Sequence, residues 1–213
     1  MDCVLCKKKT DSFLDEKTYI KYYHCIQCEF ISKSPELYQT IEKQKERYTL
    51  HNNTEEDEGY KAYFQRFLDF TLPHVGNPKK ALDFGCGATS LLSQILETKD
   101  ITCEYFDPIY YPNTLDNSKK YDLIMSTEVF EHLHHPKKTF ESLMSRLEKG
   151  GYLAIQTQFH TNDKEVFKKW YYHQDLTHIV FFTKKSFEVL AKMYDSEVVA
   201  SNGKNIVILR KND

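Results

Sequence analysis

Beyond residue 79, hydrophobic positions alternate between two spacings, and this alternation predicts strands and helices in turn. Four short apolar runs are typical of buried parallel strands: residues 80–84, 101–106, 121–127 and 152–157. Three segments have helical spacing: 91–96, 140–147 and 186–194. Finally, residues 198–200 and 206–209 flank Asn202-Gly203, which indicates a β-hairpin. The pattern predicts an α/β fold that ends in an antiparallel hairpin.

The first 78 residues follow a different pattern. Residues 18–23 are strand-like, and Ser34-Pro35-Glu36 begins a helix whose inner face would carry Leu37, Ile41 and Tyr48. A second, aromatic-rich helix is expected over residues 60–72, ending before Pro73. We therefore expect three parts, namely residues 1–32, a helical connector over 33–78, and the main domain over 79–213.

Asp83, Gly85 and Gly87 form a tight turn between the first strand and the first helix of the main domain. Glycine allows a sharp turn and a close approach of the backbone to a ligand. The start of the helix offers free N–H groups. Asp107 ends the next strand, twenty residues after Gly87, where a carboxylate can accept both hydroxyls of a ribose. These features predict a site for a nucleotide-type cofactor.

The Asp-x-Gly-x-Gly spacing resembles the first motif of the class I S-adenosylmethionine (SAM)-dependent methyltransferases, in which a third glycine stands where this chain has Thr89. The resemblance implies a Rossmann-like, doubly wound sheet, a connector that covers the cofactor, and SAM as the cofactor. It also implies the residues that bind SAM: Asp83, Phe84, Gly85, Gly87, Asp107, Pro108 and Thr127. Only thirteen residues separate Asp107 from Tyr121, so the third strand of this fold must be short or lack its flanking helices.

Composition and charge narrow the classes of partner and the compartment that we expect for this protein. The chain has 213 residues and a formal charge of −2, so no overall positive field attracts nucleic acid or anionic lipid. We expect a small-molecule acceptor, with nucleic acid disfavoured. No apolar run reaches the length of a membrane span, and the N-terminus lacks a signal-like segment, so membrane insertion is not expected. These features predict a cytoplasmic, reducing compartment in which disulfides are disfavoured.

Two Cys-x-x-Cys pairs, separated by eighteen residues, lie near the N-terminus and predict a zinc ribbon with a structural ion; the ligands would be Cys3, Cys6, Cys25 and Cys28. A disulfide pair or a redox motif is the alternative. His24 breaks the ligand spacing and is expected at the surface, whereas Cys86 and Cys103 fall in the predicted core. Similar ribbons precede some rRNA-base and sugar C-methyltransferases. Lys7, Lys8 and Lys9 would suit an RNA backbone or a solvated loop.

The candidate catalytic residues follow the strand at 121–127, as Glu128-x-x-Glu131-His132. On one helical turn these side chains would share a face and could hold a divalent metal. The pattern resembles the ubiquinone-pathway O-methyltransferases and the small-RNA 2′-O-methyltransferases. In the latter a further histidine completes a metal site, and His178 is the candidate here. The alternative is that Glu131 and His132 hold the loop or act as a base without a metal.

Ser126-Thr127-Glu128-Val129 lacks the Asn-Pro-Pro-Tyr motif of amino-methyltransferases, so an acceptor hydroxyl or activated carbon fits better. An aromatic insert over residues 159–182 suits a planar or apolar acceptor, or packs over the end of the sheet. Polar groups of the connector could also reach the site: Tyr48, His51, Asn52, Asn53 and Tyr63. We therefore expect SAM-dependent methylation of a small-molecule hydroxyl. The alternatives are an RNA methyltransferase, a sugar C-methyltransferase, and a non-catalytic SAM-binding or zinc-mediated interaction module.

Overall fold

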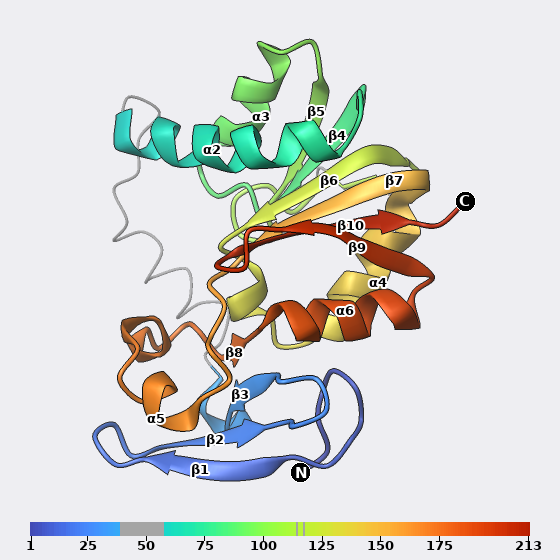
Figure 1. The fold of residues 1–213 in the computed structure, drawn as a ribbon. Coiled ribbons are helices and arrows are strands. Elements are labelled where there is room, and N and C mark those ends of the chain that lie inside the picture. The colour runs from blue at the N-terminus through green and yellow to red at the C-terminus, as the bar shows by residue number, and fades with distance from the viewer. Residues whose placement is uncertain (39–57, 114, 117) are drawn as a thin grey trace.

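The computed structural model describes residues 1–38, 58–113, 115–116 and 118–213 (Figure 1). Where a helix is expected from Ser34, the described residues form a single 3₁₀ turn, η1 (Pro35–Leu37), after which Tyr38 is extended. The expected inner-face positions Ile41 and Tyr48 lie outside the described residues. The polar candidates His51, Asn52 and Asn53 lie outside them too. No helix among the described residues is long and apolar enough to cross a membrane.

The main sheet of the described chain has the strand order β5-β4-β6-β7-β10-β9. Its strands are β4 (Lys80–Phe84), β5 (Thr102–Phe106), β6 (Tyr121–Thr127), β7 (Leu147–Gln156), β9 (Ser196–Ser201) and β10 (Ile206–Lys211). The four strands β4 to β7 are parallel, and β10 runs antiparallel to both β7 and β9. The expected α/β sheet with its C-terminal hairpin is therefore confirmed.

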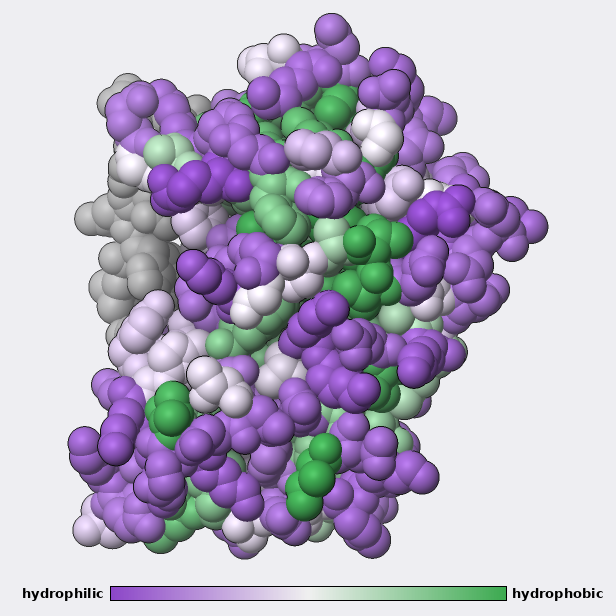
Figure 2. All heavy atoms as spheres, in the orientation of Figure 1, coloured by the Kyte–Doolittle hydropathy of each residue, from purple (hydrophilic) through white to green (hydrophobic). Residues whose placement is uncertain are grey.

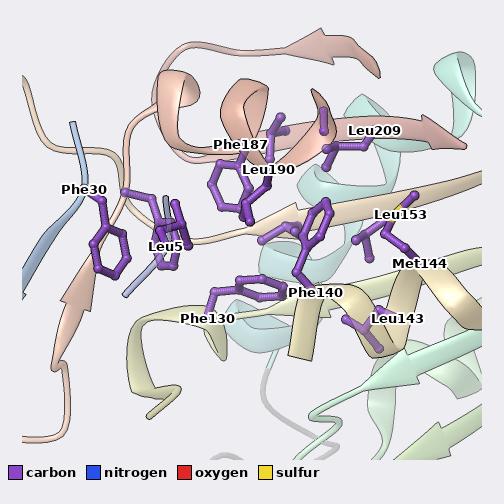
Figure 3. Packing of buried hydrophobic residues seen from close by; sticks show 14 of the residues in the cluster. Leu5, Phe30, Phe130, Phe140, Leu143, Met144, Leu153, Phe187, Leu190 and Leu209 are labelled. Atoms are coloured by element: carbon purple, nitrogen blue, oxygen red, sulfur yellow. The ribbon is translucent and has the colours of Figure 1, made fainter. Parts of the chain in front are cut away.

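Helices cover both faces of this sheet (Figure 1). They are α2 (Glu58–Thr71), α3 (Leu91–Glu97), α4 (Pro136–Arg146) and α6 (Lys184–Met193). Leu123 of β6 is buried in one apolar cluster with residues of α2 and α3, and its neighbour Ile124 is buried in another with residues of α4 and α6. Successive side chains of a strand point to opposite faces, which is why continuous apolar runs form these strands. Figure 3 shows Phe140, Phe187 and Leu209 within the second cluster.

The structure differs most from the expectations at the start of β7 and at the β5 edge of the sheet. The expected helix over 140–147 ends at Arg146, because Leu147 already pairs with Tyr121 and starts β7. β7 continues through Gly150, whose φ of 71° places it in the left-handed region, and its register with β6 shifts. At the other edge, the described residues add no strand beyond β5. Asp107 forms only an isolated bridge with Tyr111.

The N-terminal segment forms a second sheet, in the order β1-β2-β3-β8. Its strands are β1 (Asp11–Asp15), β2 (Ile20–His24), β3 (Ile31–Lys33) and β8 (Val180–Phe181). β8 comes from the aromatic insert, which also contains α5 (Lys164–Phe167) and η4 (Tyr171–Gln174). The ribbon therefore packs against the main domain, with the Phe30 and Phe182 rings 5.2 Å apart. The boundaries 1–32, 33–78 and 79–213 stay a prediction, and the second sheet joins residues from both sides of them.

His24 is not at the surface as expected. Its side chain is buried, and Nε2 lies 2.8 Å from Oδ1 of Asn162 in the insert. Burial lowers the pKa of His24. Cys86 and Cys103 are buried, as predicted for core positions. The face in Figure 2 is mostly hydrophilic, with apolar residues in separate groups.

Candidate active site

The two glycines of the turn that follows β4 have different surroundings. Gly85 and Gly87 have φ angles of 82° and 68°, a region in which other residues are strained. A Cβ on Gly85 would lie 2.3 Å from Cγ2 of Val129, whereas one on Gly87 would meet no atom within 4 Å. Gly85 therefore permits close packing against the segment after β6. Gly87 leaves its backbone open to a ligand.

Asp107 lies at the end of β5, as the sequence predicts, and its carboxylate is held by the backbone. Oδ2 accepts a hydrogen bond from the N–H of Gly87 at 3.1 Å. Oδ1 accepts from the N–H groups of Ile109 and Tyr110, at 2.8 and 3.0 Å. Pro108 is exposed within this turn. These bonds fix the carboxylate beside the glycine turn.

Three buried polar atoms at the carboxyl ends of the strands have no hydrogen-bond partner among the described residues. They are Oδ1 of Asp83 in β4, Oγ of Ser126 in β6 and Oε1 of Gln156 in β7. Burial, and next the charge of Asp107, raise the pKa of Asp83 to about 7. Unpaired buried polar groups are costly, so they indicate a polar ligand at this edge. Together with the open backbone at Gly87, they fit a SAM site.

The remaining expected cofactor residues flank this turn. Phe84, the last residue of β4, stacks on Phe106 with ring centroids 5.4 Å apart. Thr127, the last residue of β6, is half-buried. Helix α2 reaches the same region, because the hydroxyl of Tyr63 donates to Oε1 of Glu128 at 2.9 Å and accepts from Nε2 of Gln156 at 2.6 Å. The connector thus reaches the candidate catalytic residues through Tyr63.

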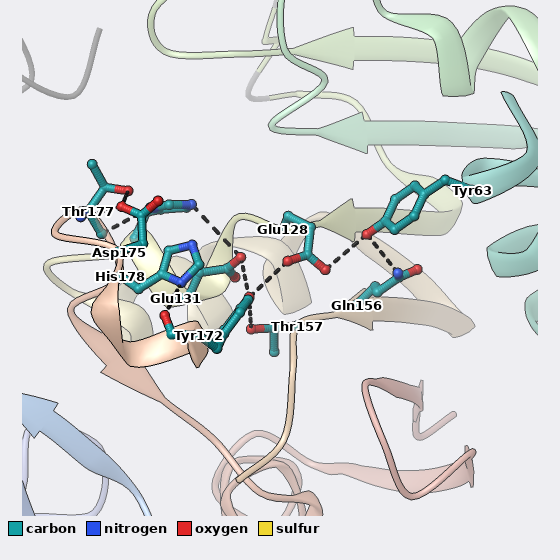
Figure 4. Close-up of polar contacts among 10 residues, drawn as sticks. Tyr63, Glu128, Glu131, Gln156, Thr157, Tyr172, Asp175, Thr177 and His178 are labelled. Atoms are coloured by element: carbon teal, nitrogen blue, oxygen red, sulfur yellow. Dashed lines mark hydrogen bonds and ion pairs between the residues drawn. The ribbon is translucent and has the colours of Figure 1, made fainter. Parts of the chain in front are cut away.

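Glu128 and Glu131 are joined through the hydroxyl of Tyr172 (Figure 4). This oxygen lies 2.8 Å from Oε2 of Glu128 and 2.6 Å from Oε1 of Glu131. A phenol has one proton, so only one carboxylate can accept it, and the other contact needs a proton on a carboxyl group. Accordingly, burial and the neighbouring Glu131 raise the pKa of Glu128 to about 8, and burial raises that of Glu131. Without a cation, the pair therefore retains a proton near neutral pH.

His132 and His178 are oriented in the same way. Nδ1 of His132 lies 2.9 Å from the carbonyl of Thr177, and Nδ1 of His178 lies 2.8 Å from that of Tyr172. A carbonyl only accepts, so Nδ1 carries a proton in both rings, and in a neutral ring Nε2 is then the nitrogen that can accept a proton or bind a metal. Burial, and next His132, lower the pKa of His178 to about 4, which keeps its ring neutral.

Both imidazoles lie beside Glu131, and Nε2 of His132 is 3.8 Å from its Oε1. One ligand atom from each of Glu131, His132 and His178 lies within 4.8 Å of the others. Glu131 is fully buried, and its Oε2 has no hydrogen-bond partner among the described residues. Histidines that bind metals commonly donate a hydrogen bond from the other ring nitrogen to an acceptor that orients the ring, as both rings do here. The donor set therefore fits a divalent cation.

The expected helical turn over Glu128-x-x-Glu131-His132 is wrong. Glu128 has a φ of 52°, and only η3 (Phe130–His132) is helical, as one 3₁₀ turn. The hydroxyl of Tyr172, rather than a shared helix face, brings the carboxylates together. In the sequence, Tyr172 stands out only as one of the aromatic residues of the insert, and no motif marks Thr177 or Gln156. Their roles depend on contacts over long sequence separations, which no local motif indicates.

The four N-terminal cysteines also come together, with their sulfurs within 4.8 Å of one another. Sγ of Cys3 lies 3.6 Å from that of Cys28, and Sγ of Cys6 lies 3.4 Å from that of Cys25. Zinc–sulfur bonds of about 2.3 Å in a tetrahedron place sulfurs roughly 3.7 Å apart. The cluster therefore fits a tetrahedral metal ion such as zinc.

Comparisons with known proteins agree with this fold. The sequence profile of a methyltransferase domain family matches residues 54–201. A comparison with curated proteins found no match. A solved 1,6-didemethyltoxoflavin-N1-methyltransferase from Burkholderia thailandensis, with bound S-adenosylhomocysteine, is 15% identical with a TM-score of 0.62. The match covers 89% of this chain and 99% of that one.

Two further structures are more distant. An O-methyltransferase family protein from Burkholderia thailandensis is 12% identical with a TM-score of 0.51, over 80% of this chain and 63% of that one. A mitomycin 7-O-methyltransferase is 10% identical with a TM-score of 0.50, over 79% and 66%. The Rossmann-like sheet and its glycine turn thus define a SAM-dependent methyltransferase. The chain belongs to the methyltransferase domain family that matches residues 54–201.

Proposed function

We propose that this enzyme transfers a methyl group from SAM to a hydroxyl oxygen of a small-molecule acceptor. The observation that carries this proposal is the contact between Gly85 and Val129. The glycine turn, which we assign to the cofactor, lies directly against the segment with Glu128, Glu131 and His132. A cofactor on the turn would therefore have carboxylates and imidazoles beside it.

We assign SAM to the carboxyl ends of β4, β5 and β6, where it would supply an electrophilic methyl group when bound. Asp107 is already oriented by three backbone N–H groups, and its remaining lone pair would accept from a ribose hydroxyl. The other proposed cofactor residues are Asp83, Phe84, Gly85, Gly87, Pro108 and Thr127. The open backbone at Gly87 supports this assignment.

For the acceptor side we propose that Glu131, His132 and His178 hold a divalent cation, with Glu128 next to them. The grouping of one ligand atom from each of these three side chains, the hydrogen bonds that orient both rings through Nδ1, and the unpartnered Oε2 of Glu131 support this role. A cation there would lower the pKa of an acceptor hydroxyl. The alternative is that one imidazole takes the hydroxyl proton directly, since the same lone pair serves a base or a metal ligand.

A small molecule is the acceptor class that best agrees with the charge of −2. The 1,6-didemethyltoxoflavin and mitomycin enzymes, which share the fold, are named for acceptors of this size. The Trp170 and Tyr172 rings are tilted against each other with centroids 4.9 Å apart, and we assign to this aromatic part of the insert the contact with a planar or apolar acceptor.

We also propose that Cys3, Cys6, Cys25 and Cys28 hold a structural zinc ion. The sulfur separations support it. Cysteines bind zinc as thiolates only when they are not oxidised to disulfides, so this role agrees with a reducing compartment such as the cytoplasm.

The test is a screen of acceptor pools for label transferred from methyl-labelled SAM, with hydroxyl, amine, thiol and carbon acceptors kept in separate pools. We expect label in a hydroxyl pool, and we expect His178→Gln to lose transfer while SAM affinity, measured by calorimetry, is retained. His74→Gln is the matched control, because Nδ1 of the exposed His74 also lies 2.8 Å from a backbone carbonyl, that of Phe70. Transfer to another pool alone would refute the hydroxyl proposal.

A further inference from the structure

The turn over residues 175–179 positions several groups of the acceptor side by direct contact. His178 belongs to it, and the carbonyl of Thr177 accepts from Nδ1 of His132. The N–H of Ile179 donates to the carbonyl of Glu131 at 2.8 Å. The position of this turn therefore sets where both imidazoles lie relative to Glu131.

Lys33, the last residue of β3 in the N-terminal sheet, contacts both ends of this turn. Its backbone N–H donates to the carbonyl of Ile179 at 2.8 Å, as the last link of β3 to the insert. Its ammonium group donates to the carbonyl of Asp175 at 2.7 Å. The two contacts enclose Thr177 and His178.

The burial of Lys33 is unusual for a lysine. The side chain is 1% exposed, although lysine is among the residues least often found fully buried. Removing an ammonium group from water is costly unless its hydrogen bonds compensate. A buried apolar side chain would fill β3 without that cost, so packing alone does not explain a lysine here.

We propose that Lys33 is a positioning residue, through which the N-terminal sheet, continuous with the cysteine ribbon, fixes the turn that orients His132 and His178. On this view the ribbon is part of the acceptor-side site. The inference concerns the site assigned above and rests on that proposed function for its catalytic meaning. The contacts themselves do not depend on which acceptor is used.

The test uses full-length protein labelled with ¹⁵N-histidine, in which hydrogen-bonded Nδ1–H protons are followed by NMR. Lys33→Met keeps the length of the side chain and removes the ammonium group. We expect the Nδ1–H signals of His132 and His178 to shift and to exchange with water at least roughly tenfold faster, because the turn loses one of its anchors. Zinc content and SAM affinity should stay unchanged.

Tyr22→Phe is the matched control. The hydroxyl of Tyr22, also buried in the ribbon sheet, lies 2.9 Å from Nδ1 of His173 in the insert. This contact joins the same two parts of the chain but does not touch the turn. We expect Tyr22→Phe to change the signal of His173 and to leave those of His132 and His178 as in the wild type.

Unchanged His132 and His178 signals in folded Lys33→Met would overturn the proposal. If that variant does not fold, hydrogen exchange of the backbone amides in the wild type tests the proposal instead. The amides of Lys33 and Ile179 should then exchange at similar rates, as one cooperative unit. Protection of Ile179 that persists after the ribbon amides have exchanged would equally overturn it. None of these measurements needs an acceptor. The role of Lys33 can therefore be tested even if the acceptor screen fails.

Discussion

Gly85 and Val129 lie so close that a Cβ on Gly85 would stand 2.3 Å from Cγ2 of Val129. Gly85 belongs to the turn after β4, and Val129 lies between Glu128 and η3. The two halves of the candidate site are therefore in van der Waals contact. The effect of a substitution in one half should therefore depend on the side chains in the other half.

Gly85→Ala should destabilise the fold by roughly 2–4 kcal/mol, because crowding against Val129 adds to the strain of a positive φ. Gly87→Ala has the strain without the crowding and should cost about 1 kcal/mol. Val129→Ala should partly rescue Gly85→Ala and not Gly87→Ala. Chemical denaturation of the single and double variants measures this, and equal losses for the two glycines would contradict the crowding.

Asp107→Ala should weaken SAM binding by roughly 1.5–3 kcal/mol, because it removes the proposed ribose acceptor and the bond that orients Gly87. Asp116→Ala is the control, since Oδ1 of Asp116 also accepts from a local backbone N–H, that of Ser118, far from the glycine turn in sequence. Calorimetry should show wild-type affinity for Asp116→Ala. The same affinity for Asp107→Ala would exclude Asp107 from the ribose site.

The stability of the cation-free protein should fall as pH rises. The folded-state pKa of Glu128 is raised to about 8, so the folded protein binds a proton that the unfolded chain has released. The burial of Glu128 does not destabilise the fold below the pKa of about 4.5 that this group has in the unfolded chain. The destabilisation then grows as pH rises, until the pH passes 8. Glu128→Gln should therefore be relatively more stable at pH 8 than at pH 5, by on the order of 1–3 kcal/mol. Denaturation at both pH values, giving the same difference for the variant and the wild type, would contradict this.

Mn²⁺ should bind at Glu131, His132 and His178, where it can be followed by electron paramagnetic resonance. We expect His178→Gln to weaken binding by roughly tenfold or more, since one of three protein ligands is lost. His74→Gln should bind as the wild type does. Absence of bound Mn²⁺ in the wild type, with transfer activity that survives a chelator, would instead favour an imidazole as base. Zinc content must be followed throughout.

Reductively purified protein should contain one zinc ion per chain, and Cys25→Ser should lose it. The melting temperature should fall as well, because Cys25 and Phe30 belong to the same buried cluster as Phe182. Cys103→Ala is the control, a buried cysteine outside the cysteine cluster. Elemental analysis that finds no zinc in the wild type would rule out the metal ribbon.

The sequence by itself determined the order and type of the main elements. Apolar runs fixed the buried strands, Asn202-Gly203 marked the hairpin, and Asp83, Gly85 and Gly87 marked the cofactor turn. These signals are local, because backbone geometry and burial of a strand or turn depend on neighbouring residues. The spacing of the four cysteines was informative for the same reason, since two-residue gaps suit one tetrahedral ion.

Only the tertiary structure decided how the acceptor side is assembled. Glu128 departs from the expected helical turn, and Tyr172, more than forty residues later, joins it to Glu131. His24 and Lys33 are buried because the insert packs against the ribbon, which their own sequence surroundings do not reveal. Contacts between distant segments arise only when the chain is folded and buried polar groups must find partners. No local pattern specifies which partners those are.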